Sequence, residues 1–465
     1  LGWLLHKGNS HARAENTRVI VMNKSLQIYV SSTLPSMGIN GVGAVTFNSW
    51  ALSIIRHATR GKTFFKYREL PEFVEKIKFS NGILGALSQF VSQKVRGVDA
   101  AISREFLTKE KLLEVWKKSD NKALQPRLKD FKHDVSESDL PINEKQVALD
   151  YVQNLLTNQE DHVGDLYELL SDAKLLGSFL PAEPKLEEHL SYLSRMVDRN
   201  RKNNHLDYYD MSLILRLIQL KYGGLPNKHG GVSELDHLVI DEAQDFGPVE
   251  FSIMMDSVGD KRDLTIVGDV SQKILFSRKF IGWENILDNL EIKKDTLIQL
   301  EVSFRCTVPI MNLARKVEGR KDPVSFGRPG SPVVWHRAVD QNDFLETLAD
   351  WVNGLMEKDP YKLIALICRY PKQAMELKDE LERMISCEVR IGHRDQFSFE
   401  PGVIISNIHQ IKGLEFDAVA LINPSEEFYP SKNIESRNMI YVGITRAQED
   451  LLVIGNNSFS KVLLS

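Results

Sequence analysis

The nine residues His237-Leu238-Val239-Ile240-Asp241-Glu242-Ala243-Gln244-Asp245 decide the fold of this chain. Three apolar residues run directly into two carboxylates, which is typical of a buried strand of a parallel sheet that ends in acids. Ligands of open α/β sheets bind at that end. Adjacent carboxylates there suit Mg²⁺ and an attacking water, because one can hold the metal while the next orients or deprotonates the water. The stretch alone is also compatible with a strand that ends in a solvated acidic turn.

The bulk composition indicates a globular protein with a large core. The chain has 465 residues, of which 42% are hydrophobic and 26% charged, and this length predicts two to four domains. No stretch reaches the roughly 18 apolar residues of a membrane span. The three cysteines, Cys306, Cys368 and Cys387, lack metal-ligand spacing. They are expected to be buried thiols in a reducing cytoplasm.

Charge is distributed unevenly along the chain. Residues 51–133 contain 18 Lys and Arg against 9 Asp and Glu, a net charge of +9. Because the whole chain carries −4, the remainder carries −13. A basic, helix-patterned block on an acidic protein suggests a polyanionic partner. A solvated helical face with locally paired charges explains the same numbers equally well.

The pattern of apolar runs predicts an α/β fold in two units. Strands are expected at 18–22 and 43–47, with polar residues at their C-terminal ends, and again at 238–240 and 264–267. Residues 55–220 have mostly helical periodicity and are predicted to be a helical insertion, in which 118–145 reads as a polar loop. The first α/β unit is therefore predicted at 1–54 and 221–294. The second is predicted at 295–465, with strands at 333–335, 363–367, 403–405, 418–422 and 451–454.

Several motifs in a fixed order resemble those of superfamily 1 helicases of the UvrD/Rep type. Val239 to Asp245 resembles the motif that binds Mg²⁺ and drives hydrolysis in that family. Four later stretches resemble the family's subsequent motifs: 267–272, 302–305, 407–417 and 441–447. Upstream, 19–23 and 45–50 resemble strand-end motifs that contact single-stranded DNA. Each motif is weak alone, but the complete ordered set is specific.

This resemblance implies a fold of two RecA-like P-loop NTPase domains with parallel sheets. The implied protein is a cytoplasmic, ATP-dependent DNA helicase or single-strand translocase that moves 3′ to 5′ with ATP and Mg²⁺. The implied roles on the nucleotide side are as follows: Asp241 holds Mg²⁺, Glu242 activates water, Gln272 senses the γ-phosphate, Arg305 and Arg446 act as arginine fingers, Phe304 stacks on adenine, and Gly413 and Glu415 belong to the motif that holds the ribose.

The resemblance also implies a set of residues on the DNA side. The motif positions are Asn23, Thr46, Phe47, Asn48, Trp50 and His409. Phe276 and Trp283 lie where the family tends to stack bases, although ordinary core aromatics are an equally good interpretation of both. Expected partners are single-stranded or partly duplex DNA, with RNA polymerase or a repair protein as protein partners. The sequence indicates no oligomeric state.

Two departures from the family pattern bear on activity. The phosphate-binding pattern G-x-x-x-x-G-K-[ST] is absent, because Gly61-Lys62-Thr63 has Arg56 where the first glycine is needed. The family's loop is expected upstream of residue 1, with Leu1 to Lys7 as the tail of the helix that follows it, in a chain cut from a longer one. The span from Arg305 to Val403 leaves no room for a large accessory domain, as in compact, HelD-like members. The alternative function is a non-hydrolysing helicase-like module that binds DNA or RNA polymerase.

Overall fold

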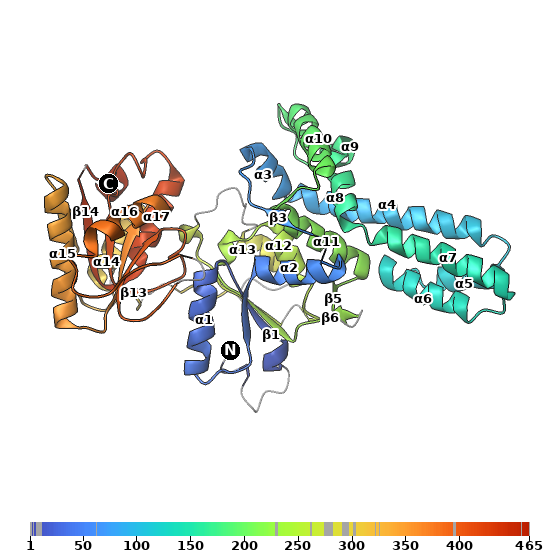
Figure 1. Ribbon diagram of the computed structural model, residues 1–465, viewed down its shortest axis with the longest axis horizontal. Helices are drawn as coiled ribbons and strands as arrows, with labels where there is room; N and C mark the ends of the chain where they lie inside the picture. Colours follow the sequence, from blue (N-terminus) through green and yellow to red (C-terminus); the bar gives the residue numbers. More distant parts are fainter. Residues whose placement is uncertain are drawn as a thin grey trace.

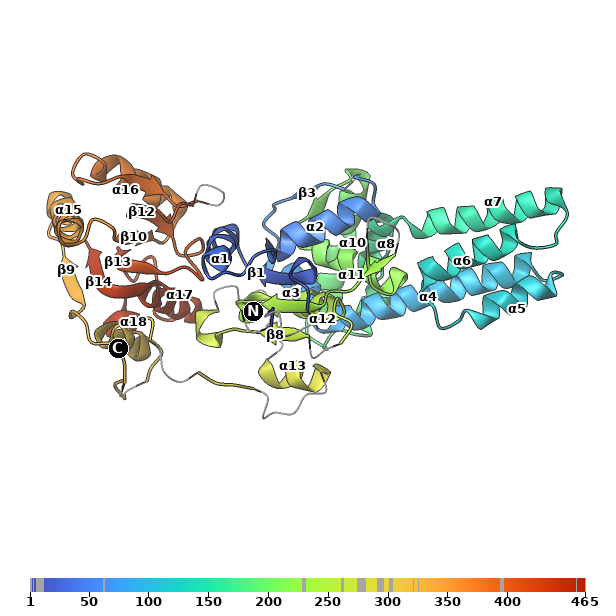
Figure 2. The same ribbon diagram turned by 90° about the horizontal axis from the view of Figure 1, so that it is seen from below.

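The computed structural model describes residues 2, 4–5, 12–61, 63–227, 231–260, 263–273, 282–290, 297–300, 304–320, 322–324, 326–393, 397–456 and 458–464. Figures 1 and 2 show an elongated molecule in which two α/β units lie side by side and a helical arm extends from one of them. None of the helices among the described residues is both long enough and apolar enough to cross a membrane.

The first sheet has four parallel strands in the order β2-β1-β7-β8. These strands are β1 (Thr17–Val21), β2 (Gly43–Thr46), β7 (His237–Ile240) and β8 (Leu264–Ile266), and the helices beside them are α1 (Lys24–Ser36), α2 (Phe47–Ala58) and α12 (Pro248–Met255). Successive side chains of β1 point to opposite faces. Ile20 therefore enters one hydrophobic cluster, while Val19 and Val21 enter another. Both faces of the sheet are covered, as expected for a parallel sheet.

The segment between β2 and β7 is mainly helical. Its helices are α3 (Glu72–Lys78), α4 (Gly82–Glu105), α5 (Glu110–Lys118), α6 (Leu124–Ser136), α7 (Ile142–Gln159), α8 (His162–Ser171), α9 (Ala173–Gly177), α10 (Leu186–Lys202) and α11 (Asp210–Tyr222). Two short strand pairs accompany them: β3 (Phe65–Lys66) pairs with β4 (Leu206–Asp207), and β5 (Leu225–Pro226) pairs with β6 (Val232–Ser233). Helices α4 to α7 form the arm, which points away from the second unit (Figures 1 and 2). The arm has a core of its own, which includes Phe106, Trp116 and Phe131.

The prediction of a polar loop over 118–145 was wrong. Helix α6 occupies its middle, and its buried face contains Leu124, Leu128, Phe131 and Val135. These residues recur at helical spacing, but charged residues fill the remaining positions, so the average polarity of the segment hid the amphipathic period.

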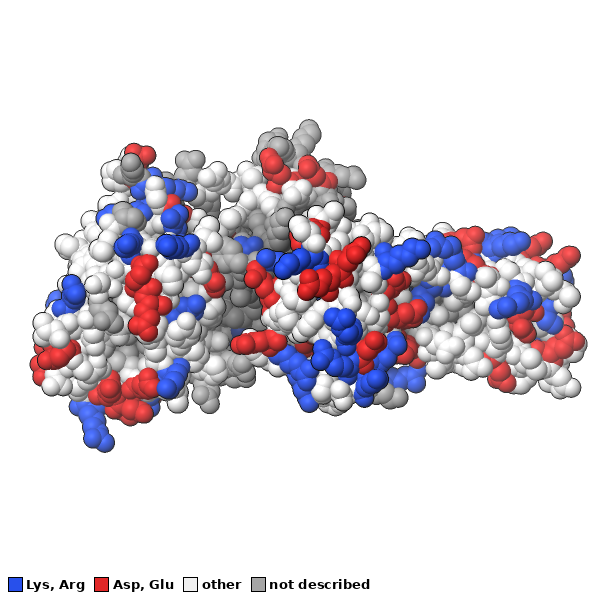
Figure 3. Space-filling model, turned by 90° about the horizontal axis from the view of Figure 1, so that it is seen from above, with Lys and Arg blue, Asp and Glu red and all other residues white. Residues whose placement is uncertain are grey.

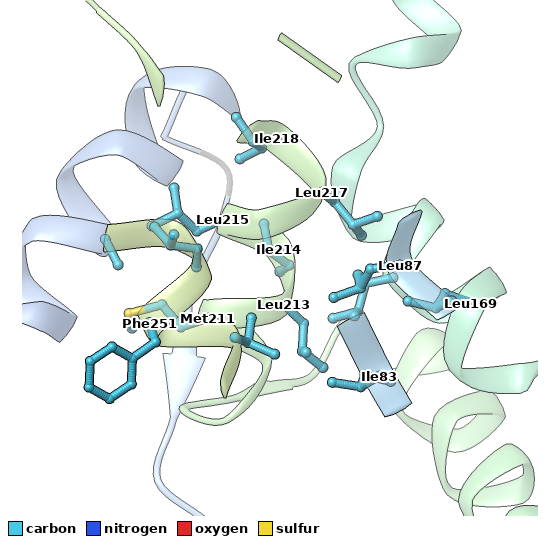
Figure 4. Packing of buried hydrophobic residues seen from close by; sticks show 14 of the residues in the cluster. Ile83, Leu87, Leu169, Met211, Leu213, Ile214, Leu215, Leu217, Ile218 and Phe251 are labelled. Carbon is cyan, nitrogen blue, oxygen red and sulfur yellow. The ribbon is translucent and has the colours of Figure 1, made fainter. Parts of the chain in front are cut away.

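Helix α11 connects the helical segment to the first sheet. Figure 4 shows its residues Met211 to Ile218 packed between Phe251 of α12 on one side and Ile83 and Leu87 of α4 on the other. Its side chains from Asp210 to Leu215 are all buried, which is typical of a helix enclosed on every side. The arm is thereby anchored in the same hydrophobic cluster as the sheet.

The second sheet has six parallel strands in the order β11-β12-β10-β13-β14-β9. They are β9 (Val334–Arg337), β10 (Leu363–Cys368), β11 (Val389–Ile391), β12 (Gly402–Asn407), β13 (Phe416–Ile422) and β14 (Ala447–Gly455). The helices of this half are α14 (Val308–Val317), α15 (Gln341–Lys358), α16 (Pro371–Leu381), α17 (Ile434–Thr445) and α18 (Lys461–Leu464), whereas α13 (Trp283–Leu290) packs on the core of the first unit. Strand β11 was not predicted. The predicted α/β class with parallel sheets is confirmed. The exact domain boundaries stay a prediction.

The two units share a hydrophobic cluster. It joins Leu26 and Leu34 of α1 to Ile411 and Leu414, which lie between β12 and β13. The loop after β12 therefore packs directly on the first unit.

Candidate functional site

The two carboxylates after β7 lie at the carboxyl edge of the first sheet. The Asp241 backbone N–H donates to the carbonyl of Ile20 on the neighbouring strand (3.0 Å). Glu242 has a left-handed backbone (φ +53°), a conformation that strains a residue with a Cβ. The Glu242 N–H donates to Asp241 Oδ1 (2.9 Å), which stabilises this turn. The strand end therefore holds two adjacent acids in a fixed arrangement.

The electrostatics of Asp241 favour a bound cation. Burial, followed by repulsion from Glu242, raises the pKa of Asp241 to about 6, while Arg305 and Arg446 act to lower it. A cation beside this carboxylate would relieve the penalty on its charged form. Mg²⁺ fits this site, because it is usually held by one or two carboxylates together with water and phosphate oxygens. Among the described residues no group of three or more His, Cys, Asp or Glu could enclose a metal.

A chain of hydrogen bonds connects Glu242 to the second unit. Gln244 Nε2 donates to Glu242 Oε2 (2.6 Å), and Gln244 Oε1 accepts the Asp269 N–H (2.9 Å). Gln272 Nε2 donates to Asp269 Oδ2 (2.9 Å). Finally, Arg446 Nη2 donates to Gln272 Oε1 (2.5 Å). The predicted residues Glu242, Gln272 and Arg446 thus belong to one continuous network.

Arg446 is completely buried at the end of α17. Its guanidinium also donates to the carbonyls of Val442 (3.2 Å) and Leu414 (3.1 Å). Burial is the main cause that lowers the pKa of Arg446. The network therefore fixes this cation at the contact between the units.

Arg305 lies closer to solvent than Arg446. Arg305 Nε pairs with Glu415 Oε1 (2.7 Å), and Gln448 Nε2 donates to the other oxygen of Glu415 (2.8 Å). The structure thus joins the predicted Arg305 and Glu415 directly. Phe304 beside them is 76% exposed.

The loop between β12 and β13 is docked on the first unit by Lys412. Lys412 Nζ lies 2.5 Å from Asp245 Oδ2 and 3.6 Å from Glu242 Oε2, and the Lys412 and Asp245 side chains are 2% and 0% exposed. Asn23 Nδ2 donates to the Lys412 carbonyl (3.2 Å). Gly413 has φ +81°, and a Cβ on it would approach a Leu26 methyl to 2.7 Å. Glycine is therefore needed for this close approach.

Sequence reasoning missed the roles of Gln244, Asp245 and Lys412. All three lie inside motifs that were recognised, so their positions were visible. Their contacts were not visible, because Lys412 and Asp245 are separated by 167 residues in the chain.

The predicted DNA-side residues differ in exposure. Asn23 caps α1 by accepting the Leu26 N–H (2.8 Å), and Thr46 caps α2 by accepting the Ser49 N–H (3.1 Å). Phe47 is buried against Trp50 and Phe246. Of the predicted residues on these two elements, only Asn48 is exposed.

The remaining DNA-side predictions lie further along the chain. His409 follows β12, and burial, Arg369 and Lys412 together lower its pKa to about 4, so its imidazole is neutral near pH 7. Trp283 begins α13 and packs, partly buried, on the core of the first unit. Phe276 lies outside the described residues.

The β3–β4 patch is a surface that was not predicted. Its residues are Phe64, Lys66, Tyr67, Arg68 and Tyr208, all of them exposed. Tyr67 and Tyr208 each follow the last paired residues of β3 and β4, so their backbones are neighbours. Figure 3 views the molecule from above Figure 1, that is, from the side on which α3 and α10 lie. Lys and Arg side chains gather near the middle of this face, with Asp and Glu side chains beside them. The alternation of aromatic and basic residues in 64–68 was the available signal.

The basic block is partly neutralised within the fold. Lys94 pairs with Asp165 and Glu168, whereas Arg96 and Arg104 are exposed. Among the described residues, bases of the block also pair with acids outside it in Arg60–Glu160, Lys78–Asp207, Lys78–Asp210 and Lys109–Glu144. Other bases pair with acids of the block itself, in Lys76–Glu72, Lys122–Asp130, Arg127–Asp99 and Arg127–Asp120. Local pairing therefore accounts for part of the excess, and a polyanion partner stays a prediction for the rest.

Comparisons with known proteins agree with the motif pattern. The UvrD/REP helicase N-terminal domain matches residues 17–279, and the UvrD-like helicase C-terminal domain matches residues 387–458. A probable DNA helicase II homolog of Mycoplasma capricolum is 23% identical over 213 residues, which cover 44% of this chain and 29% of that protein.

Two solved structures are also similar. The C-terminal domain of a possible DNA helicase from Lactobacillus plantarum WCFS1 has a TM-score of 0.29 and 20% identity, over 35% of this chain and 92% of that one. Arterivirus nonstructural protein 10, a helicase in complex with DNA, has a TM-score of 0.25 and 15% identity, over 50% of this chain and 42% of that one. The first family domain alone spans more than half of the chain, and with the ordered motifs it shows that this chain belongs to the UvrD/Rep-like family of superfamily 1 helicases.

Proposed function

We propose that this chain is the motor part of an ATP-dependent DNA helicase or single-strand translocase that moves 3′ to 5′ in the cytoplasm. The observation that carries the proposal is the hydrogen-bond network from Glu242 through Gln272 to Arg446. It joins the acid that would activate water to an arginine of the other unit. Any change in the distance between the units therefore acts on the hydrolytic residues.

The nucleotide would lie between the two units. Bound Mg²⁺-ATP would supply the electrophilic γ-phosphate and the metal that neutralises it. Asp241 would hold the metal, Glu242 would orient and deprotonate the water, and Arg305 and Arg446 would stabilise the charge on the phosphates. Gln272, which accepts from Arg446, would register the γ-phosphate. Glu415 and Gly413 would lie at the ribose, and the exposed Phe304 would be available to stack on adenine.

Single-stranded DNA would bind across the carboxyl edges of the sheets. Asn48 and the neutral His409 are the motif residues best placed to contact it, and the β3–β4 patch adds exposed rings and cations. Stacking on aromatic side chains contributes roughly 1–3 kcal/mol per base and tolerates any sequence. This chemistry supports a motor that does not read sequence.

ATP turnover with and without single-stranded DNA tests the proposal. Glu242→Gln should abolish turnover while DNA affinity is retained, because the water loses its base. Glu376→Gln, on the exposed face of α16, is the matched control and should leave turnover unchanged. Since the pattern G-x-x-x-x-G-K-[ST] is absent from these 465 residues, turnover should be measured both for this chain and for the longest natural protein that contains it.

A second candidate is a helicase-like module that binds DNA or RNA polymerase without hydrolysis. The absence of the phosphate-binding pattern from the 465 residues favours it. DNA binding without turnover in both proteins would support this candidate and refute the motor.

A further inference from the structure

Arg305 and Glu415 belong to a closed set of contacts within the second unit. Both oxygens of the Glu415 carboxylate are held, one by Arg305 Nε (2.7 Å) and the other by Gln448 Nε2 (2.8 Å). The backbone carbonyls of Arg305 and Gln448 share a further partner, because Arg328 Nη2 donates to both, at 3.1 Å and 2.7 Å. A single guanidinium nitrogen therefore fixes the distance between the two residues whose side chains bind Glu415.

The loop that carries Arg328, between α14 and β9, is attached to the start of α14. The Val308 N–H donates to the Arg328 carbonyl (2.8 Å), and Thr307 pairs with Arg328 as a bridge between parallel segments. A Cβ on Gly330 would collide with the Thr307 side chain, so only glycine allows the loop to lie this close. The backbone of Arg328 is therefore held in place two residues after Arg305.

Charged neighbours orient the Arg328 guanidinium from the other side. Glu449 Oε1 lies 3.5 Å from Arg328 Nη1, and the other oxygen of Glu449 accepts from Lys362 Nζ (2.5 Å). The Arg328 and Glu449 side chains are 40% and 45% exposed, and an ion pair this exposed contributes little stability. Hydrogen bonds from a charged donor are stronger, so the two carbonyls are the more important partners of Arg328.

We infer that Arg328 is a positioning residue, which holds Arg305 where its guanidinium can act on the nucleotide phosphates. The inference deepens the proposed function and rests on it, because Arg305 is proposed there to stabilise the charge on those phosphates. A cation stabilises a transition state only from the correct position, and a misplacement of about 1 Å can cost roughly 100-fold in rate. Arg328 lies between the motifs at 302–305 and 407–417, so the motif pattern did not include it.

ATP turnover by the longest natural protein that contains this chain, with saturating single-stranded DNA, is the first test. Arg328→Gln should lower kcat by about 10- to 100-fold. Arg328→Lys should recover most of this loss, because both carbonyls accept from one nitrogen, which an ammonium can replace. The control Arg320→Gln removes a cation that is 61% exposed and 3.6 Å from Glu318, and it should leave kcat unchanged.

A double variant distinguishes positioning of Arg305 from a general structural role. In a protein that already carries Arg305→Gln, adding Arg328→Gln should lower kcat by less than about 2-fold, because residues that act through one another are not additive. A general loss of structure would instead lower kcat by the same factor with and without the Arg305 side chain.

Side-chain NMR of the 465-residue chain with isotope-labelled arginine tests the positioning without turnover. Arg305→Lys identifies the Nε–H signal of Arg305, the group that pairs with Glu415. Arg328→Gln should speed the exchange of this N–H with water by about 5-fold or more, as expected when a hydrogen bond that supports the pair is lost. Arg320→Gln should leave the exchange unchanged.

The two measurements separate this inference from the proposed function. Unchanged N–H exchange in Arg328→Gln, or an equal loss of kcat with and without Arg305, would overturn the inference. If the wild type shows no turnover but the exchange accelerates, the motor is refuted and Arg328 still positions Arg305. If Glu242→Gln abolishes turnover while Arg328→Gln does not change it, the motor is supported and only the role of Arg328 is refuted.

Discussion

The buried ion pair between Lys412 and Asp245 should be a principal tie between the two units. Lys412→Met removes the cation that lies 2.5 Å from Asp245 Oδ2 and 3.6 Å from Glu242 Oε2, while the Asp245 side chain, which is 0% exposed, stays buried. Removing one partner of a buried pair typically costs about 3–5 kcal/mol, because the remaining charge stays desolvated. Since about 1 kcal/mol shifts the melting temperature of a 150–250-residue unit by about 2–4 °C, we expect a decrease of roughly 6–20 °C.

Thermal and urea unfolding, followed by circular dichroism and calorimetry, measure this effect. The matched control is Lys372→Met, which removes the i,i+4 pair with Glu376 at 3.4 Å, where the side chains are 87% and 61% exposed. That substitution should change the unfolding free energy by less than about 0.5 kcal/mol.

The double variant Lys412→Met/Asp245→Asn separates the charge from the packing. It removes both charges, so it should recover most of the stability lost in Lys412→Met. The reasoning is refuted if Lys412→Met costs less than about 1 kcal/mol, or if the double variant is as unstable as the sum of the single variants.

Three further predictions concern other parts of the chain. His162 is buried without a hydrogen bond to either ring nitrogen, and burial and then Lys221 lower its pKa to about 3. Between pH 6.5 and 3 the unfolded chain takes up a proton on this imidazole and the folded chain does not. The free energy of unfolding should therefore fall by up to about 1.4 kcal/mol per pH unit as pH decreases. Urea titrations at several pH values should show a shallower fall for His162→Phe than for the wild type. Equal pH dependence of the unfolding free energy in the wild type and His162→Phe would contradict this prediction. Gly413→Ala should lower the free energy of unfolding by more than the roughly 1–2 kcal/mol that a left-handed backbone costs an alanine, because its Cβ meets Leu26. The control Gly319→Ala, at φ +84° with no atom within 4 Å of the added Cβ, should lose only the backbone contribution. Similar unfolding free energies for the two variants would show that Leu26 moves away freely. Finally, if the arm contacts DNA, the double variant Arg96→Glu/Arg104→Glu should weaken DNA binding and reduce the dependence of the affinity on salt. Unchanged DNA binding would indicate that the basic block of residues 51–133 is a solvated face.

Local sequence determined much of the fold. Apolar runs that end in polar residues predicted β1, β2 and β7 and most strands of the second sheet, because a buried parallel strand needs a continuous apolar stretch. The prediction failed where local signals were weak. β11 has only three residues, and α6 hides its apolar face among charges. The ordered motifs also predicted one set of site residues, and the structure brings these residues to the contact between the units: Asp241, Glu242, Gln272, Arg305, Arg446 and Glu415.

Only the tertiary structure decided which partners these residues have. Lys412 contacts Asp245, and Arg446 reaches Gln272 across 174 residues of chain. Arg328 donates to the carbonyls of Arg305 and Gln448, which are 23 and 120 residues away in the chain. A sequence lists charges and rings, but their pairing depends on how two sheets dock, and docking is set by side-chain packing over the whole contact. The sequence by itself therefore determined the family and predicted the chemical groups of the candidate site, whereas the hydrogen-bond network between the two units emerged only from their packing.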